Sequence, residues 1–188
     1  MGGERRIDAI SVLSIIKGII FSVAALLIVM VSWPALRRPR SHGFPRFFAF
    51  MAILGLLVLN VDHWFVAPFT PLHIVSWALL TASLLLVIHG FYLLRVVGQP
   101  RENIEDTTKL VRVGAYRYIR HPLYSSLLCL VWGICLKDPS LLSIGLALAA
   151  TAALIATART EEVENLQRFG DDYVAYMEKT KLFIPYLL

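Results

Sequence analysis

The sequence is poor in cysteine and has none of the glycine-rich motifs that bind nucleotides. Its two cysteines, Cys129 and Cys135, fall inside an apolar stretch, so they indicate packed free thiols rather than a disulfide framework or a metal site. No G-x-G-x-x-G follows a predicted strand and no βαβ pattern is visible, which argues against a Rossmann domain. Internal repeats and low-complexity segments are also missing. We therefore expect one domain over residues 1–188.

Long apolar runs are what the sequence has instead. Hydrophobic residues make up 57% of the chain and charged residues 16%, which lies outside the usual range of soluble domains. A membrane-spanning helix needs about 20 mostly apolar residues. The candidate runs are residues 10–33, 47–66, 74–94, 123–136 and 141–158. The sequence thus predicts an all-α integral membrane protein with about five transmembrane helices, three of them within residues 1–94 and the rest within a C-terminal half, 95–188.

The last two apolar runs are predicted to form an antiparallel hairpin. Only "KDPS", residues 137–140, separates them, and a short break that contains proline favours a tight helical connection. At 1.5 Å per residue the fourth run is about 21 Å long, less than the bilayer core of roughly 30 Å. The polar segment that precedes this run is therefore expected to begin at interface depth, which is the first indication of a site there.

Basic residues are distributed unevenly among the connections. The first connection carries Arg37, Arg38, Arg40 and Arg46, the second carries no Lys or Arg, and the third connection and the tail are again basic. The positive-inside rule then predicts that the first connection, the third connection and the C-terminus are cytoplasmic. We attribute the basic segments to topology and contacts with membrane lipids, and not to nucleic-acid binding.

A polar and aromatic segment, "GAYRYIRHPLYSS" at residues 114–126, leads into the fourth run. Pro122 stands where a helix is expected to begin, and the free N–H groups of a first helical turn can bind a carboxylate or another anion. Arg120, His121 and Tyr124 lie within a few residues and add hydrogen-bond donors. Taken singly, each of these residues is also compatible with a helix cap or an interface anchor.

A second polar cluster follows the fifth run, in "ARTEEVENLQRFGDDYVAYMEKT", residues 158–180. Adjacent carboxylates at a membrane exit repel each other unless they are paired or solvated. This cluster is either a charged helix end that leaves the bilayer, or a site in which Glu161 or Glu162 faces the third connection and accepts hydrogen bonds. Phe169, Tyr173 and Tyr176 recur at near-helical spacing and are expected to pack on the bundle.

The two segments "KLVRVGAYRYIRHPLY" and "EEVENLQRFGDDYVAYMEKT" resemble the paired motifs of the isoprenylcysteine carboxyl methyltransferase family, over residues 109–185. The related membrane phospholipid N-methyltransferases share the Arg-His-Pro-x-Tyr and Glu-Glu elements. The resemblance implies a helical membrane enzyme that uses S-adenosylmethionine to methylate a lipophilic acceptor entering from the bilayer, with its active site on the cytoplasmic side and no metal. It places cofactor contacts at Thr108, Lys109, Leu110, Val111, Tyr116, His121, Pro122, Leu123, Tyr124 and Glu161.

Glu162 and Arg159 are the catalytic candidates. An amine or thiol acceptor would need a base, for which Glu162 and His121 are both candidates. The sequence departs from the family at Thr108, often a histidine, and at Thr157, usually an arginine one turn before the first glutamate. Arg159 is two residues further on, about 200° around the helix, and should face elsewhere. The carboxylate of a prenylated cysteine and a phospholipid, amine or thiol all remain open as acceptors. A membrane reductase and a non-catalytic relative remain as further alternatives.

Overall fold

The structure is a computed structural model that describes residues 2–66, 69–101, 104 and 106–186, with side chains from residue 14 onward. Within these residues the chain is helical and contains no strand, only isolated bridges. The elements are α1 (Gly2–Leu36), α2 (Gly43–Asn60), η1 (Val61–His63), α3 (Pro71–Val96), η2 (Gly114–Arg117), α4 (Pro122–Cys135), α5 (Leu141–Phe169) and α6 (Asp171–Lys179).

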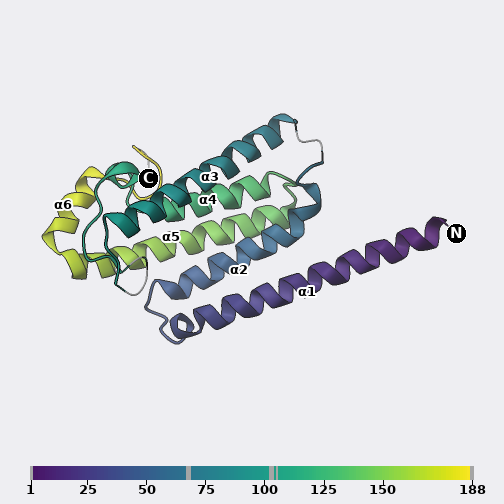
Figure 1. Ribbon diagram of the computed structural model, residues 1–188, viewed down its shortest axis with the longest axis horizontal. Helices are drawn as coiled ribbons and strands as arrows, with labels where there is room; N and C mark the ends of the chain where they lie inside the picture. The colour runs from purple at the N-terminus through teal and green to yellow at the C-terminus, as the bar shows by residue number, and fades with distance from the viewer. Residues whose placement is uncertain (1, 67–68, 102–103, 105, 187–188) are drawn as a thin grey trace.

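The long helices lie side by side in an order that differs from their order in the chain (Figure 1). α3 packs on α4, α4 on α5, α5 on α2, and α2 on α1. α4 and α5 form the antiparallel hairpin that the short "KDPS" connection predicts. α1 diverges from the other helices toward the N-terminus, and its apolar side chains are largely exposed, as expected for a helix that faces lipid.

The prediction of an all-α integral membrane fold is confirmed. Among the described residues, four segments are long and apolar enough to cross a membrane: Ser14–Leu36, Gly43–His63, Pro71–Val96 and Leu141–Phe169. α4 is the shorter apolar helix, as expected for the fourth run. The main difference from the sequence expectation is the length of α5, which continues from the apolar run through the acidic segment to Phe169, because no proline or glycine lies between the end of that run and Gly170.

Small residues allow close contact between the helices of the bundle. A Cβ added to Gly133 would lie 2.9 Å from the Leu80 side chain, so α3 and α4 approach each other at a point where only glycine fits. Ser76 on α3 donates a 2.6 Å hydrogen bond to the Gly133 carbonyl at the same place. Leu56 and Val131 are fully buried in the adjoining core. These contacts fix the position of α4, whose first turn forms part of the site described below.

The polar segments gather at one end of the bundle. The α1–α2 connection, the loop of residues 97–121, α6 and the C-terminal segment all lie at this end (Figure 1). The C-terminal segment pairs with the chain before α4, since Ile119 and Lys181 form a parallel bridge and the Arg120 N–H donates a 2.7 Å hydrogen bond to the Lys181 carbonyl. This grouping is the one that the charge pattern predicts for segments on a single side of a membrane.

Candidate active site

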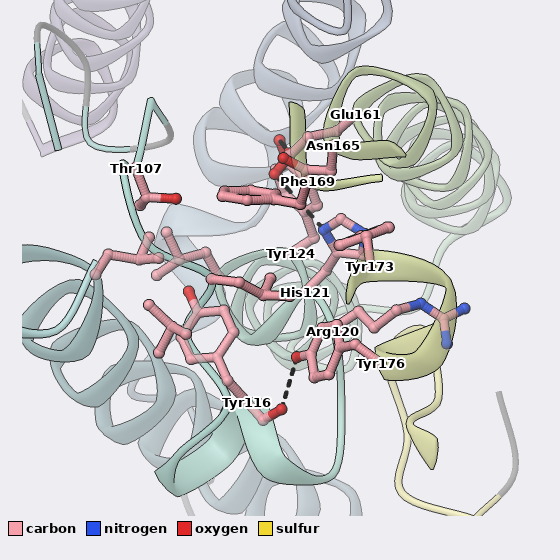
Figure 2. Close-up of a pocket in the computed structure, with 14 residues that line it drawn as sticks. Thr107, Tyr116, Arg120, His121, Tyr124, Glu161, Asn165, Phe169, Tyr173 and Tyr176 are labelled. Carbon is pink, nitrogen blue, oxygen red and sulfur yellow. Dashed lines mark hydrogen bonds and ion pairs between the residues drawn. The ribbon is translucent and has the colours of Figure 1, made fainter. Parts of the chain in front are cut away.

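A chamber of about 560 Å³, counting its open mouth, lies at the polar end of the bundle (Figure 2). We call it the inner chamber. Its walls come from α3, the loop of residues 97–121, the start of α4, the end of α5 and α6. It is lined by Leu94, Thr107, Leu110, Val111, Tyr116, Arg120, His121, Leu123, Tyr124, Glu161, Asn165, Phe169, Tyr173 and Tyr176.

The start of α4 forms one wall of the inner chamber. Pro122 is at the first helical position and His121 is the N-cap residue, without a side-chain cap bond, so the proline takes the place predicted for it. Upstream, Gly114 has a φ of 59°, and a Cβ there would come within 2.5 Å of the His89 imidazole. The neighbouring Ala115 N–H donates a 3.3 Å hydrogen bond to that ring. Glycine therefore lets η2 turn tightly against α3 and brings Tyr116 to the chamber.

The end of α5 supplies a carboxylate to the opposite wall. Glu161 accepts a 2.5 Å hydrogen bond from the Tyr124 hydroxyl. The His121 Nδ1 atom lies 3.9 Å from the Glu161 carboxylate, and the His121 and Tyr124 rings stack with their centroids 5.4 Å apart. The two polar segments that the sequence singled out therefore meet here, with a negative charge on one side and the first turn of a helix on the other (Figure 2).

An ion pair with little solvent exposure connects the start of α4 to the end of α5 and to the segment after α6. Arg120 Nε donates a 2.5 Å hydrogen bond to Glu162, and the two side chains are only 9% and 5% exposed. Arg120 Nη1 also donates to the carbonyls of Met177 and Thr180, at 3.2 and 2.5 Å. Its guanidinium accordingly points away from the other labelled residues in Figure 2. One arginine thus joins the start of α4, the end of α5 and the segment after α6.

Two buried tyrosines of α6 close the inner chamber. Burial raises the pKa of Tyr173 and of Tyr176 well above the ordinary value, so both phenols remain protonated at neutral pH. The Tyr176 hydroxyl donates a 2.6 Å hydrogen bond to the Tyr116 carbonyl. Together with Phe169, these rings give the chamber an aromatic surface that suits a planar or cationic ligand.

Most of the expected cofactor contacts line the inner chamber. Seven of the predicted positions do so: Leu110, Val111, Tyr116, His121, Leu123, Tyr124 and Glu161. Three positions do not. Thr108 and Lys109 are exposed, and the Thr108 hydroxyl donates a 2.9 Å hydrogen bond to the Gln99 carbonyl, so Thr107 is the threonine that faces the chamber. Pro122 is buried close to Gly90 of α3.

The two catalytic candidates lie beside the inner chamber rather than on its surface. Glu162 is directed to Arg120, and its carboxylate is 3.9 Å from His121 Nε2. Arg159 is 66% exposed and approaches Glu162 at 3.5 Å. Thr157 is fully buried and donates its hydroxyl hydrogen to the Ala153 carbonyl at 2.7 Å. Thr157 and Arg159 therefore face different sides of α5, as their separation along the helix predicts.

Sequence reasoning missed several residues of the lining. Asn165 and Phe169 follow Glu161 at intervals of four, so all three occupy one face of α5, and this periodicity could have identified them. Phe169, Tyr173 and Tyr176 were expected to pack on the bundle. The two tyrosines are indeed buried, at 2% and 5% exposure, and they line the inner chamber as well. Thr107 and Leu94 carry no signal in the sequence that separates them from their neighbours.

The fold and the site together define a multi-pass helical membrane protein with a polar, aromatic chamber at one end of its bundle. The chain belongs to the phospholipid methyltransferase family, whose family model matches residues 71–171. This range extends from the start of α3 to the first residue of α6 and includes most of the inner chamber. No curated protein and no solved structure matches the chain. Its family thus makes it a membrane methyltransferase.

Proposed function

We propose that the inner chamber binds S-adenosylmethionine and that the protein transfers its methyl group to a lipid acceptor from the bilayer. The observation that supports this most is the meeting of the α4 start with Glu161 at one chamber, within the range matched by the family. The positive-inside pattern of the connections supports a cytoplasmic location of the chamber and the C-terminus as part of this proposal.

The residues of the inner chamber fit the chemical groups of this cofactor. The free N–H groups in the first turn of α4 suit its carboxylate, because a helix start favours negative charge. Glu161 suits its ammonium or ribose hydroxyl groups. Aromatic faces at Tyr116 and Tyr124 suit a sulfonium. When bound, S-adenosylmethionine supplies a methyl group on a positively charged sulfur, already activated toward a nucleophile.

The protein's own part in the reaction is then to align the acceptor and exclude water. An amine acceptor must lose a proton, and the titratable groups beside the α4 start include the ring of His121 and the carboxylates of Glu161 and Glu162, each 3.9 Å from that ring. Glu162 holds Arg120 in place, which keeps the chamber wall fixed. A carboxylate acceptor, such as that of a prenylated cysteine, would need no base.

Calorimetry on the purified full chain in detergent tests this proposal. Glu161→Ala should weaken the binding of S-adenosylmethionine at least tenfold, which corresponds to the loss of a charged hydrogen bond of about 1.5–3 kcal/mol. Glu178→Ala is the matched control, because Glu178 is an exposed glutamate of α6 that does not line the chamber. If Glu161→Ala binds the cofactor as tightly as the parent protein, the assignment of the inner chamber is wrong.

A further inference from the structure

A groove on the outside of the bundle runs between α3 and α4. We call it the α3–α4 groove. Leu79 and Leu86 of α3 line one side, and Leu128, Trp132 and Leu136 line the other side at intervals of four along α4 and its C-cap. α3 is the outermost helix of the bundle on this side, so the groove opens toward the surrounding lipid (Figure 1).

The length of the α3–α4 groove corresponds to one leaflet of a bilayer. On α4 it extends from Ser125 to Leu136, which is about 16 Å at 1.5 Å per residue. The hydrocarbon core is roughly 30 Å thick, so one leaflet accounts for about 15 Å. At the polar end of the bundle, Phe183 and Ile184 of the C-terminal segment also line the groove. An acyl chain that lies in it would thus have its headgroup at this polar end.

At the same end the α3–α4 groove meets a basic hollow between η2 and α6. Tyr118 lines both the groove and the basic hollow, and Arg117 and Lys179 are exposed on the hollow's surface. A third cation of the hollow, Arg112, is already paired with Asp172 at 2.9 Å. Within the part of the chain that the structure describes, no carboxylate forms an ion pair with Arg117 or Lys179. Two cations are therefore available to an anion at the mouth of the groove.

The α3–α4 groove is separate from the inner chamber. Tyr116 and His121 line the inner chamber, whereas Tyr118 and Ile119 of the same segment line the groove. The buried Tyr176 lines both the basic hollow and the inner chamber, so its ring forms the wall between those two spaces. A ligand in the groove would therefore lie behind the wall of the chamber, away from the cofactor and the acceptor of the proposed function.

We propose that the α3–α4 groove binds one anionic phospholipid that is not a substrate, with an acyl chain along α4 and its phosphate at Arg117 and Lys179. Guanidinium and ammonium groups both bind phosphate oxygens through charge-assisted hydrogen bonds. Two unpaired cations favour a headgroup with net negative charge and repel the ammonium of a zwitterionic headgroup. Phosphatidylglycerol meets this requirement, and it has neither an amine nor a free carboxylate to accept a methyl group.

Quenching of Trp132 fluorescence by brominated lipid tests whether a chain occupies the groove. The purified full chain in detergent is titrated with phosphatidylglycerol or phosphatidylcholine that carries the same brominated acyl chains, which quench an indole on contact. Phosphatidylglycerol should quench at a lower mole fraction. Trp132→Phe should remove the quenching that is specific to phosphatidylglycerol, because Trp132 is the tryptophan that lines the groove.

Arg117→Gln tests the headgroup contact. It should raise the mole fraction of phosphatidylglycerol at half-maximal quenching about fivefold, as expected for the loss of one basic residue near an anionic headgroup. Lys179→Gln should have a similar effect. Arg95→Gln is the matched control, since Arg95 is an exposed arginine at the end of α3 that lines neither the groove nor the basic hollow. Thermal unfolding without lipid shows whether each variant is folded.

Competition then identifies the source of the phosphate. Unbrominated phosphatidylglycerol should relieve the quenching more than an equal amount of unbrominated phosphatidylcholine, and glycerophosphoglycerol, which has the same phosphate without chains, should not relieve it. Equal quenching by the two brominated lipids, or equal effects of Arg117→Gln and Arg95→Gln, would overturn the proposal. So would strong competition by glycerophosphoglycerol, which indicates a soluble ligand, or a Trp132 that no lipid quenches because a second copy of the chain covers the groove.

Discussion

Replacing Glu162 by glutamine distinguishes a structural role of this residue from a direct role in proton transfer. The Arg120–Glu162 pair has a 2.5 Å hydrogen bond and side chains that are 9% and 5% exposed, so it is a buried ion pair. Removing one partner of such a pair destabilises a protein by about 3–5 kcal/mol. Arg120 keeps its bonds to the Met177 and Thr180 carbonyls, so we expect a value near the lower limit, about 3 kcal/mol.

For a chain of this size that loss corresponds to a decrease in Tm of roughly 6–12 °C. The assay is thermal unfolding of the purified protein in detergent, combined with methyl transfer at saturating cofactor at a temperature well below the lower Tm. The double variant Arg120→Gln/Glu162→Gln should recover part of the Tm, because neither charge is then buried alone. An unchanged Tm in Glu162→Gln together with lost turnover would refute the reasoning and identify Glu162 as a catalytic base.

Two further predictions concern the walls of the inner chamber. Gly114→Ala should lower cofactor affinity and Tm, since its positive φ and the 2.5 Å approach to His89 leave no room for a Cβ. Gly145→Ala is the control: it lies within α5 with nothing within 4 Å of the added Cβ, so the Tm should stay the same or rise and the cofactor affinity should not change. Calorimetry and thermal unfolding measure both variants, and a loss of affinity and Tm in Gly145→Ala equal to that in Gly114→Ala would contradict the argument. Burial raises the pKa of Tyr173 and Tyr176 above the ordinary value of about 10, so the stability linked to these phenols is complete below pH 10 and is lost as the pH rises above it. Tyr176→Phe should reduce the slope of Tm against pH in this alkaline range, and a parent protein whose Tm does not decrease there would disprove the linkage.

The fold could be predicted from the sequence because its dominant signal is local. Apolar runs long enough to span a bilayer, separated by proline or glycine, determine each helix without reference to any other. The extension of α5 to Phe169 was harder to predict, because its second half is too polar to be recognised as a membrane-spanning segment. The only local sign that the helix continues is that no proline or glycine occurs between the apolar run and Gly170. The side-by-side order of the helices depends on contacts between distant residues, such as Gly133 with Leu80, that no local pattern records.

The candidate site was predictable where a sequence motif determines the local backbone geometry. It was not predictable where contacts between distant residues determine which side chain turns inward. Pro122 indicates the helix start, and from that the position of His121 and Tyr124 follows. The sequence does not show which arginine of "YRYIR" turns inward: Arg117 is exposed, with its guanidinium 5.9 Å from the Tyr118 ring, whereas Arg120 is buried. That choice depends on the bridge between Ile119 and Lys181, residues far apart in the chain.

The residues matched by the family and the residues before them contribute to different parts of the polar end of the bundle. The inner chamber is built from α3 onward, largely within the residues matched by the family, and its groups suit a cofactor that every member of such a family would share. A second cavity beside it takes much of its wall from residues 31–46, before that range. Glu161 and Asn165 line both cavities, so the polar end of the protein is built by residues inside and outside the matched range.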